Sequence, residues 1–173
     1  MIRLDGSSLS VADLAAVASG AAVALDPAAL ARVAENRTVV QKILDEGRVV
    51  YGINTGFGQF ATVVIPPDQL SRLQLNLVRS HAAGVGEPLS RRQTRALIAA
   101  RIDCLLKAHS GIRPEPIELL AACLNRDVLP VIPSQGSVGA SGDLAPLAHM
   151  ALLLVGEGHA WHPSSWRPKR AWP

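Results

Sequence analysis

The sequence predicts a mainly α fold in a single domain. Apolar residues at helical spacing are the first indication, because Leu70, Leu73 and Leu77 recur three and four positions apart. The second is that capping residues and prolines precede the periodic stretches and glycines follow them. The third is that the strand-like stretch 49–53 is too short to demand a sheet. At 173 residues the chain has the length of one domain.

Each expected helix has a recognisable beginning. Ser10, Asp26 and Ser90 have side chains that cap a first helical turn. A proline follows Asp26 at the favoured first helical position, and a pair of prolines opens the third helix. Glycines lie just beyond most of the expected ends, as is typical of helix termini. The expected helices are 11–19, 27–46, 67–83, 91–109, 114–124 and 144–155.

Composition excludes several classes of function. Apolar residues make up 49% of the chain, yet no uninterrupted apolar stretch approaches the ~20 residues of a membrane span. We read the apolar excess as surface meant for other parts of a larger assembly. No signal-peptide pattern follows Met1, and a cytoplasmic protein is expected. The net charge of +3 comes from Arg167, Lys169 and Arg170, so residues 1–158 are close to neutral and offer no basic face for nucleic acid.

The most informative motif is Ala140, Ser141 and Gly142, inside the glycine-rich stretch 136–146. Side chains this small leave little to stop the backbone folding onto itself. The Gly142 amide nitrogen would then attack the Ala140 carbonyl carbon, an approach that a Cβ at position 142 would obstruct. Loss of water closes a five-membered imidazolone, and loss of the Ser141 hydroxyl leaves an exocyclic methylene. The motif therefore predicts an electrophile made from the chain itself.

At this point the sequence resembles the aromatic amino acid ammonia-lyases, whose methylidene-imidazolone (MIO) group forms from Ala-Ser-Gly. Residues 51–58, Tyr-Gly-Ile-Asn-Thr-Gly-Phe-Gly, are similar to the family's mobile active-site loop. Residues 80–89, Ser-His-Ala-Ala-Gly-Val-Gly-Glu-Pro-Leu, are similar to its substrate-selecting segment in the version of histidine ammonia-lyases. The resemblance covers roughly 1–158, the N-terminal part of a longer family chain. It implies the helical N-terminal domain of an aromatic amino acid lyase fold, with no diffusible cofactor.

The resemblance also implies how the chemistry is divided among residues. Ser141 is the precursor of the MIO group rather than a nucleophile, and Tyr51 is the base that removes the substrate's β-proton. A free tyrosine has a pKa near ~10, so the site must stabilise a phenolate. The positive end of the helix that begins at Asp143 and Leu144 is suited to that. Gly58 and its neighbouring glycines would let Tyr51 swing in and out.

His81 and Asn54 are the substrate-binding residues that the resemblance implies. His81 would exchange a hydrogen bond with an imidazole or phenol ring, and Asn54 belongs to the Tyr51 loop. Phenylalanine-specific relatives place apolar residues where this chain has Ser80 and His81. L-histidine, converted to urocanate and ammonia, is therefore the first expected substrate and tyrosine the second. The family enzyme is a homotetramer whose composite active site uses residues beyond this chain.

The residues alone leave other interpretations open. A lone helical histidine such as His81 is more often structural, and Tyr51, the only tyrosine, would usually do no more than satisfy its hydroxyl if it were buried. The stretch 136–142 also fits a tight loop or an anion-binding nest of amides. A hydrolase elbow fails because position 143 is not glycine, and no Gly-Lys-Ser/Thr follows as in a P-loop. The rival hypothesis is a truncated, catalytically inactive fragment with the ring unformed.

The other histidines and the cysteines carry no expected site, and no metal is expected. His149, like His109, is interpreted as an ordinary helix residue. Cys104 and Cys123 are expected to be free, buried thiols. His159 and His162 are weak evidence for metal binding.

The character of the sequence changes after Gly158. All three tryptophans and three of the twelve prolines fall in 159–173, and no periodicity survives there. We therefore expect the family resemblance to end at 158 and the segment 159–173 to be disordered.

Overall fold

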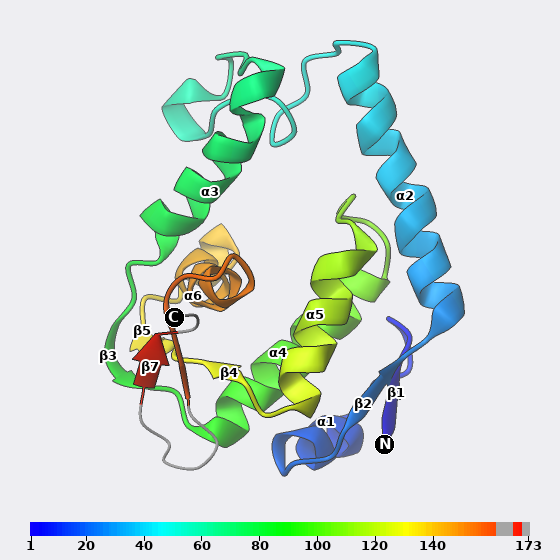
Figure 1. The fold of residues 1–173 in the computed structure, drawn as a ribbon, viewed down its shortest axis with the longest axis vertical. Helices are drawn as coiled ribbons and strands as arrows, with labels where there is room; N and C mark the ends of the chain where they lie inside the picture. The colour runs from blue at the N-terminus through cyan, green and yellow to red at the C-terminus, as the bar shows by residue number, and fades with distance from the viewer. Residues whose placement is uncertain (162–167, 171–173) are drawn as a thin grey trace.

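The computed structural model describes residues 1–161 and 168–170, and it is mainly α-helical as predicted (Figure 1). All the predicted helices are present, within a few residues of their expected bounds. They are α1 (Val11–Ala18), α2 (Pro27–Asp45), α3 (Leu70–His81), α4 (Arg91–Leu106), α5 (Pro114–Asn125) and α6 (Leu144–Leu154). A 3₁₀ turn at Pro67–Gln69 precedes α3 and accounts for its later start.

Side-chain caps explain where several helices begin. Ser10 and Ser90 each accept a hydrogen bond from the N–H three residues further on, and the side chain there returns to the backbone of the cap. Asp26 accepts from the N–H of Ala29 at 2.7 Å and is also paired with Arg3. One carboxylate therefore both starts α2 and ties it to the N-terminal strand.

Short strands join the helices at three places. β1 (Ile2–Leu4) pairs parallel with β2 (Val23–Leu25), and β3 (Val85–Pro88) pairs antiparallel with β5 (Pro133–Gln135). β6 (His159–Trp161) lies between β4 (Leu129–Pro130) and β7 (Pro168–Arg170), antiparallel to both. The sequence did not predict these strands, because segments this short have too few positions to show an alternating pattern.

The chain remains ordered past the boundary predicted at residue 158. β6 pairs with β4, and Val131 N–H donates to the carbonyl of His159 at 2.9 Å. The side chain of Ala160 is buried. The described part of 159–173 is therefore paired strand, unlike the disorder expected there. The expectation for 162–167 and 171–173, His162 included, lies outside the described residues.

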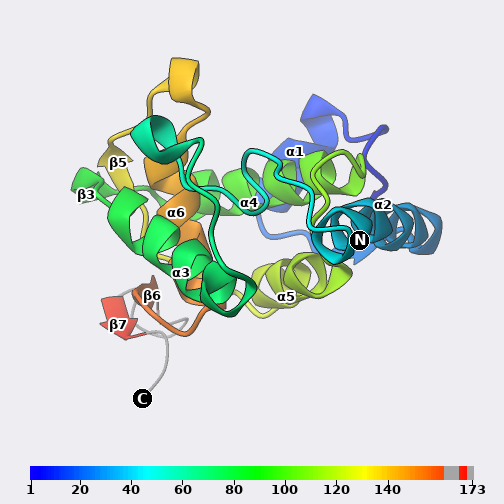
Figure 2. The ribbon, with the colours of Figure 1, turned by 90° about the horizontal axis from the view of Figure 1, so that it is seen from above.

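The hydrophobic core forms around α4, which packs against α1, α2 and α5 (Figures 1 and 2). Ile98, Ile102 and Leu106 of α4 are fully buried. They belong to one cluster with apolar side chains of the neighbouring elements: Leu4, Val17, Val23, Val33, Ile117, Leu120, Leu124 and Leu129. Cys123 is half-buried, whereas Cys104 is exposed, so the prediction of a buried thiol is wrong for Cys104.

The helices α2 and α3 extend beyond this core, and the segment 46–66 connects them across the top of Figure 1. Only Ala29 and Val33 are buried in α2, and α3 has no buried residue. Large apolar side chains are exposed in the connecting segment: Val49, Tyr51, Phe60, Val63 and Val64. Within the described residues, no helix is both long and apolar enough to span a bilayer. Clustered exposed apolar side chains of this kind are typical of surfaces that contact other protein.

A buried arginine ties the helix ends to α4. The Arg95 side chain is 2% exposed and its guanidinium makes four hydrogen bonds. The acceptors are the carbonyls of Val17, Ala21 and Leu124 and the carboxylate of Asp127, all at 2.8–2.9 Å. These carbonyls lie at or beyond the ends of α1 and α5, where backbone acceptors lack helical partners. Arg95 therefore supplies hydrogen-bond donors to these carbonyls from within the core.

Replacing Arg95 by Met should destabilise the fold strongly, because the buried Val17 and Leu124 carbonyls, the half-buried Ala21 carbonyl and the Asp127 carboxylate each lose a hydrogen bond while much of the aliphatic volume is kept. We expect a loss of about 3–5 kcal/mol in the free energy of unfolding. Arg92→Met, at an exposed position of the same helix, should stay within about 0.5 kcal/mol of wild type. Urea denaturation followed by circular dichroism measures both. Equal midpoints for the two variants would contradict the role of Arg95.

Candidate active site

A single carbonyl organises the Ala140–Gly142 loop. The Val138 oxygen accepts from the N–H of Ser141 at 2.9 Å, from the N–H of Asp143 at 3.2 Å and from the Ser141 hydroxyl at 2.9 Å. The chain turns as a 3₁₀ helix over Gly139–Ser141, and Gly142 N–H closes the turn on the Gly139 carbonyl at 3.1 Å. Residues 134–144 are all exposed, and the turn projects above α6 in Figure 2.

Two consecutive left-handed residues connect this loop to α6. Gly142 has φ +84° and Asp143 has φ +56°. A Cβ built on Gly142 would meet nothing within 4 Å outside its chain neighbours. Glycine is therefore favoured at 142 by its backbone conformation, whereas the sequence argument rested on the space a Cβ would occupy. An Asp in the same region is uncommon, and such strain is typical of functional sites.

Asp143 and Leu144 occupy the start of α6, as the sequence predicts. The Asp143 carboxylate does not cap the helix. It accepts a hydrogen bond from the Ser137 hydroxyl instead, across the base of the loop. In this structure Asp143 braces the loop against the residues that enter it, and a role in stabilising the Tyr51 phenolate stays a prediction.

His81 is the last residue of α3 and is half-buried. Its Nδ1 lies 2.8 Å from the carbonyl oxygen of Leu77. Because a carbonyl oxygen only accepts, Nδ1 carries the proton, and Nε2 is left available to a ligand. The Ser80 hydroxyl donates to the same Leu77 carbonyl at 3.0 Å. The end of α3 thus fixes the tautomer of the predicted substrate-binding histidine.

The His81 segment and the Ala140–Gly142 loop meet through glycines. β3 follows His81 and pairs with β5, which leads into the loop, with Val85 opposite Gln135. A Cβ on Gly136 would lie 3.1 Å from the Cα of Gly84, closer than side chains normally permit. Two of the three motif segments are therefore held together by direct backbone contact.

His149 of α6 takes part in the same junction, a role that the sequence did not indicate. Its Nε2 accepts a hydrogen bond from the N–H of Gly84 at 3.1 Å. Burial lowers the pKa of His149 below its usual value, which favours the neutral ring that can accept at Nε2. No local pattern reveals the contact, because Gly84 and His149 are 65 positions apart.

The Tyr51 loop lies apart from this junction. Tyr51 is 62% exposed, and its ring contacts the edge of Phe57 with centroids 5.9 Å apart. All the hydrogen bonds made by residues 50–60 in the described structure stay within 48–65. The buried tyrosine considered from the sequence is therefore not observed. Within this chain the loop is not bonded to the Ala140–Gly142 turn.

Asn54 holds the Tyr51 loop in shape. Its side-chain oxygen accepts from Val50 N–H at 2.9 Å, and its amide nitrogen donates to the Arg48 carbonyl at 2.8 Å. Asn54 is 7% exposed and borders a cavity of about 400 Å³ between the end of α2 and the start of α3. Gly58 has φ +58°, which glycine adopts at little cost. Substrate contact by Asn54 stays a prediction.

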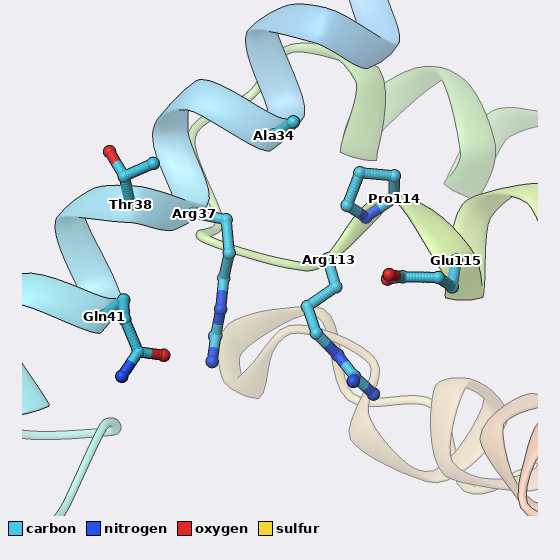
Figure 3. Close-up of a pocket in the computed structure, with 7 residues that line it drawn as sticks. All are labelled: Ala34, Arg37, Thr38, Gln41, Arg113, Pro114 and Glu115. Atoms are coloured by element: carbon cyan, nitrogen blue, oxygen red, sulfur yellow. The ribbon is translucent and has the colours of Figure 1, made fainter.

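A second cavity, of about 530 Å³, lies between α2 and the start of α5 (Figure 3). Its lining holds none of the predicted site residues and consists of Ala34, Arg37, Thr38, Gln41, Arg113, Pro114 and Glu115. The side chains of Arg37 and Arg113 extend in the same direction there. Arg37 also donates to the Gly111 carbonyl at 3.1 Å, which gives it a structural function in the turn before α5.

Comparison with known proteins agrees with the predicted resemblance and extends it. The family model for aromatic amino acid lyase matches residues 9–171. The chain is 56% identical over 161 residues to the histidine ammonia-lyase of Anaeromyxobacter dehalogenans, covering 92% of this chain and 32% of that protein. It is 50% identical to the histidine ammonia-lyase of Homo sapiens, covering 95% of this chain and 25% of that one. The chain thus spans about a third or less of these relatives.

Solved structures share the fold over nearly the whole chain. Histidine ammonia-lyase from Trypanosoma cruzi superimposes with a TM-score of 0.89 at 42% identity, covering 98% of this chain and 32% of that one. Tyrosine aminomutase from Streptomyces globisporus gives 0.91 at 37% identity, with the same coverage. The family match runs to residue 171, so the predicted end of the resemblance at 158 is wrong. The chain belongs to the aromatic amino acid lyase family.

Proposed function

We propose that this chain is the N-terminal part of a histidine ammonia-lyase, a cytoplasmic enzyme that removes ammonia from L-histidine and leaves urocanate. One observation carries the proposal: the glycine contact at Gly84 and Gly136 places the His81 segment beside the exposed Ala140–Gly142 loop. A histidine for recognising a ring and a sequence able to form an electrophile thus belong to one junction. Relatives named histidine ammonia-lyase, 47–56% identical, support the choice of substrate.

The residues of the loop fit an MIO group. Ala140 and Gly142 belong to one tight turn, and Gly142 has the left-handed conformation that suits glycine. Positions around Gly139 and Gly142 are open, so the turn has room to contract. When formed, the group supplies an electrophilic carbon that takes up the substrate amine and makes it a better leaving group.

The roles of the side chains follow from their chemistry. His81 Nε2, left free by the Nδ1 contact with Leu77, would pair with the imidazole of the substrate. Tyr51 would take the β-proton as its phenolate, which the positive end of α6 at Asp143 and Leu144 would help to stabilise. Since Tyr51 is exposed and its loop is bonded only to itself here, the loop must dock before Tyr51 acts.

Self-association, as a homotetramer in the full-length protein, is the second part of the proposal. The exposed apolar side chains of the 46–66 segment and the absence of buried residues in α3 support it. These surfaces would be covered by the rest of the protein or by other copies, which would also complete the site around Tyr51.

L-Histidine should be the preferred substrate of the full-length protein. The Ser80–His81 pair resembles the version of histidine ammonia-lyases, and the relatives with that name are 47–56% identical to this chain. Formation of the conjugated product is followed by ultraviolet absorbance at alkaline pH, with histidine, tyrosine and phenylalanine compared by kcat/KM. A kcat/KM for tyrosine far above that for histidine would favour the alternative, a tyrosine ammonia-lyase. The similarity to a tyrosine aminomutase is the observation that supports this alternative.

Ser141→Ala should abolish activity in the full-length protein without unfolding it. Alanine removes the hydroxyl whose loss creates the methylidene, and the exposed turn accommodates it. Ser71→Ala, at an exposed position early in α3, is the matched control and should retain wild-type turnover. Thermal unfolding of both variants checks the fold. Activity of Ser141→Ala near that of wild type would show that the reaction needs no MIO group.

The 173-residue chain by itself should be catalytically inert, prone to associate and unmodified at Ser141. Its 140–142 loop is fully exposed and lacks the rigid surround that ring closure needs. Intact mass spectrometry detects the ring as a deficit of about 36 Da for two lost waters. Light scattering reports association. A monomer that carries this deficit, or that releases ammonia, would refute the expectation.

A further inference from the structure

Residues on both sides of His81 are hydrogen-bonded to α6, the helix that follows the Ala140–Gly142 loop, or to the residues just after it. Two residues before His81, the Arg79 guanidinium makes two hydrogen bonds to the carboxylate of Glu157, just beyond α6. Three residues after His81, the N–H of Gly84 donates to His149 Nε2 at 3.1 Å. The Arg79 pair is exposed to solvent, and pairs of that kind hold geometry weakly. The His149 contact is the better shielded of the two.

Gly84 is packed from several sides at once. A Cβ there would lie 3.1 Å from His149 Nε2, 3.2 Å from the Gln135 carbonyl oxygen and 3.2 Å from the Cβ of Pro133. Gly136 directly follows β5, and a Cβ on it would lie 3.3 Å from the Cβ of Ala145. Ala145 and His149 are four residues apart, so they share one face of α6. Gly84 is thus enclosed by both the entry and the exit of the loop.

We propose that His149 is a positioning residue that sets the place of His81 relative to Ser141. Its hydrogen bond fixes Gly84 to α6, and α6 begins at the residue that leaves the loop. The distance from the ring-binding histidine to the reacting centre is then set through α6 rather than through α3 alone, which has no buried residue. The inference rests on the proposed function, because it assigns His81 and Ser141 to one reaction. His149 itself contacts no substrate.

The test uses three variants of the full-length protein. His149→Leu removes the acceptor and keeps much of the volume. His149→Gln keeps an acceptor, since its Oε1 stands as many bonds from Cβ as Nε2 does. His109→Leu, at an exposed position beyond α4, makes the same substitution elsewhere and is the control. Turnover of L-histidine is expressed per chain that carries the ring, counted by intact mass, so that unfolded or unmodified molecules do not enter kcat.

His149→Leu should lower kcat by ~10- to 100-fold with little change in KM, because a small misplacement of a bound substrate affects the transition state most. His149→Gln should recover most of this loss, and His109→Leu should match wild type. Hydrogen–deuterium exchange gives a readout that needs no activity. The peptide containing Gly84 should exchange faster in His149→Leu than in wild type or His149→Gln.

The outcomes separate the two proposals. If the wild-type protein is inactive while His149→Leu still speeds exchange at Gly84, the proposed function is wrong. The contact would then be structural only, and the positioning role would be wrong as well. An active wild type whose kcat is unchanged by His149→Leu would overturn the positioning role alone. Equal loss in His149→Leu and His149→Gln would also overturn it, because the acceptor would then not be the property that matters.

Discussion

The contact between Gly84 and Gly136 is the constraint on which the rest of the site depends. A Cβ on Gly136 would stand 3.1 Å from the Gly84 Cα, so glycine at these positions allows the strands to meet without crowding. β3 and β5 can then pair, and their pairing brings the end of α3 beside the loop before α6. Larger residues at either position would separate His81 from Ser141 while leaving both helices intact.

The remainder of the fold has a tightly packed part and an exposed part. The core around α4 is fixed by buried apolar packing and by the four hydrogen bonds of Arg95. The segment 46–66, by contrast, is bonded to itself and exposes Tyr51. If the 140–142 loop supplies the electrophile and Tyr51 the base, as we propose, the two groups lie on separate loops, which suits a reaction in which the Tyr51 loop closes over a bound substrate. The same segment also exposes large apolar side chains such as Phe60 and Val64.

Local signals in the sequence predicted the helices, and contacts between distant residues accounted for what was missed. The side chains of Ser10, Asp26 and Ser90 each accept a hydrogen bond from the N–H three residues further on. These helix starts can therefore be predicted from the local sequence alone. The contact between His149 and Gly84 joins positions too far apart for any pattern to show, and His149 was therefore interpreted as an ordinary helix residue. The sequence singled out Gly142 because it lacks a Cβ, but the left-handed backbone that favours glycine there is visible only in the structure.

The most direct test of this account is the mass of the peptide containing residues 140–142, released by proteolysis from the full-length protein. We expect the remaining protein to enclose this exposed loop and hold it rigidly enough for ring closure. The peptide should then be lighter than its sequence by about 36 Da, the mass of two waters. A peptide of unaltered mass from a catalytically active preparation would contradict the central claim that this loop becomes the electrophile.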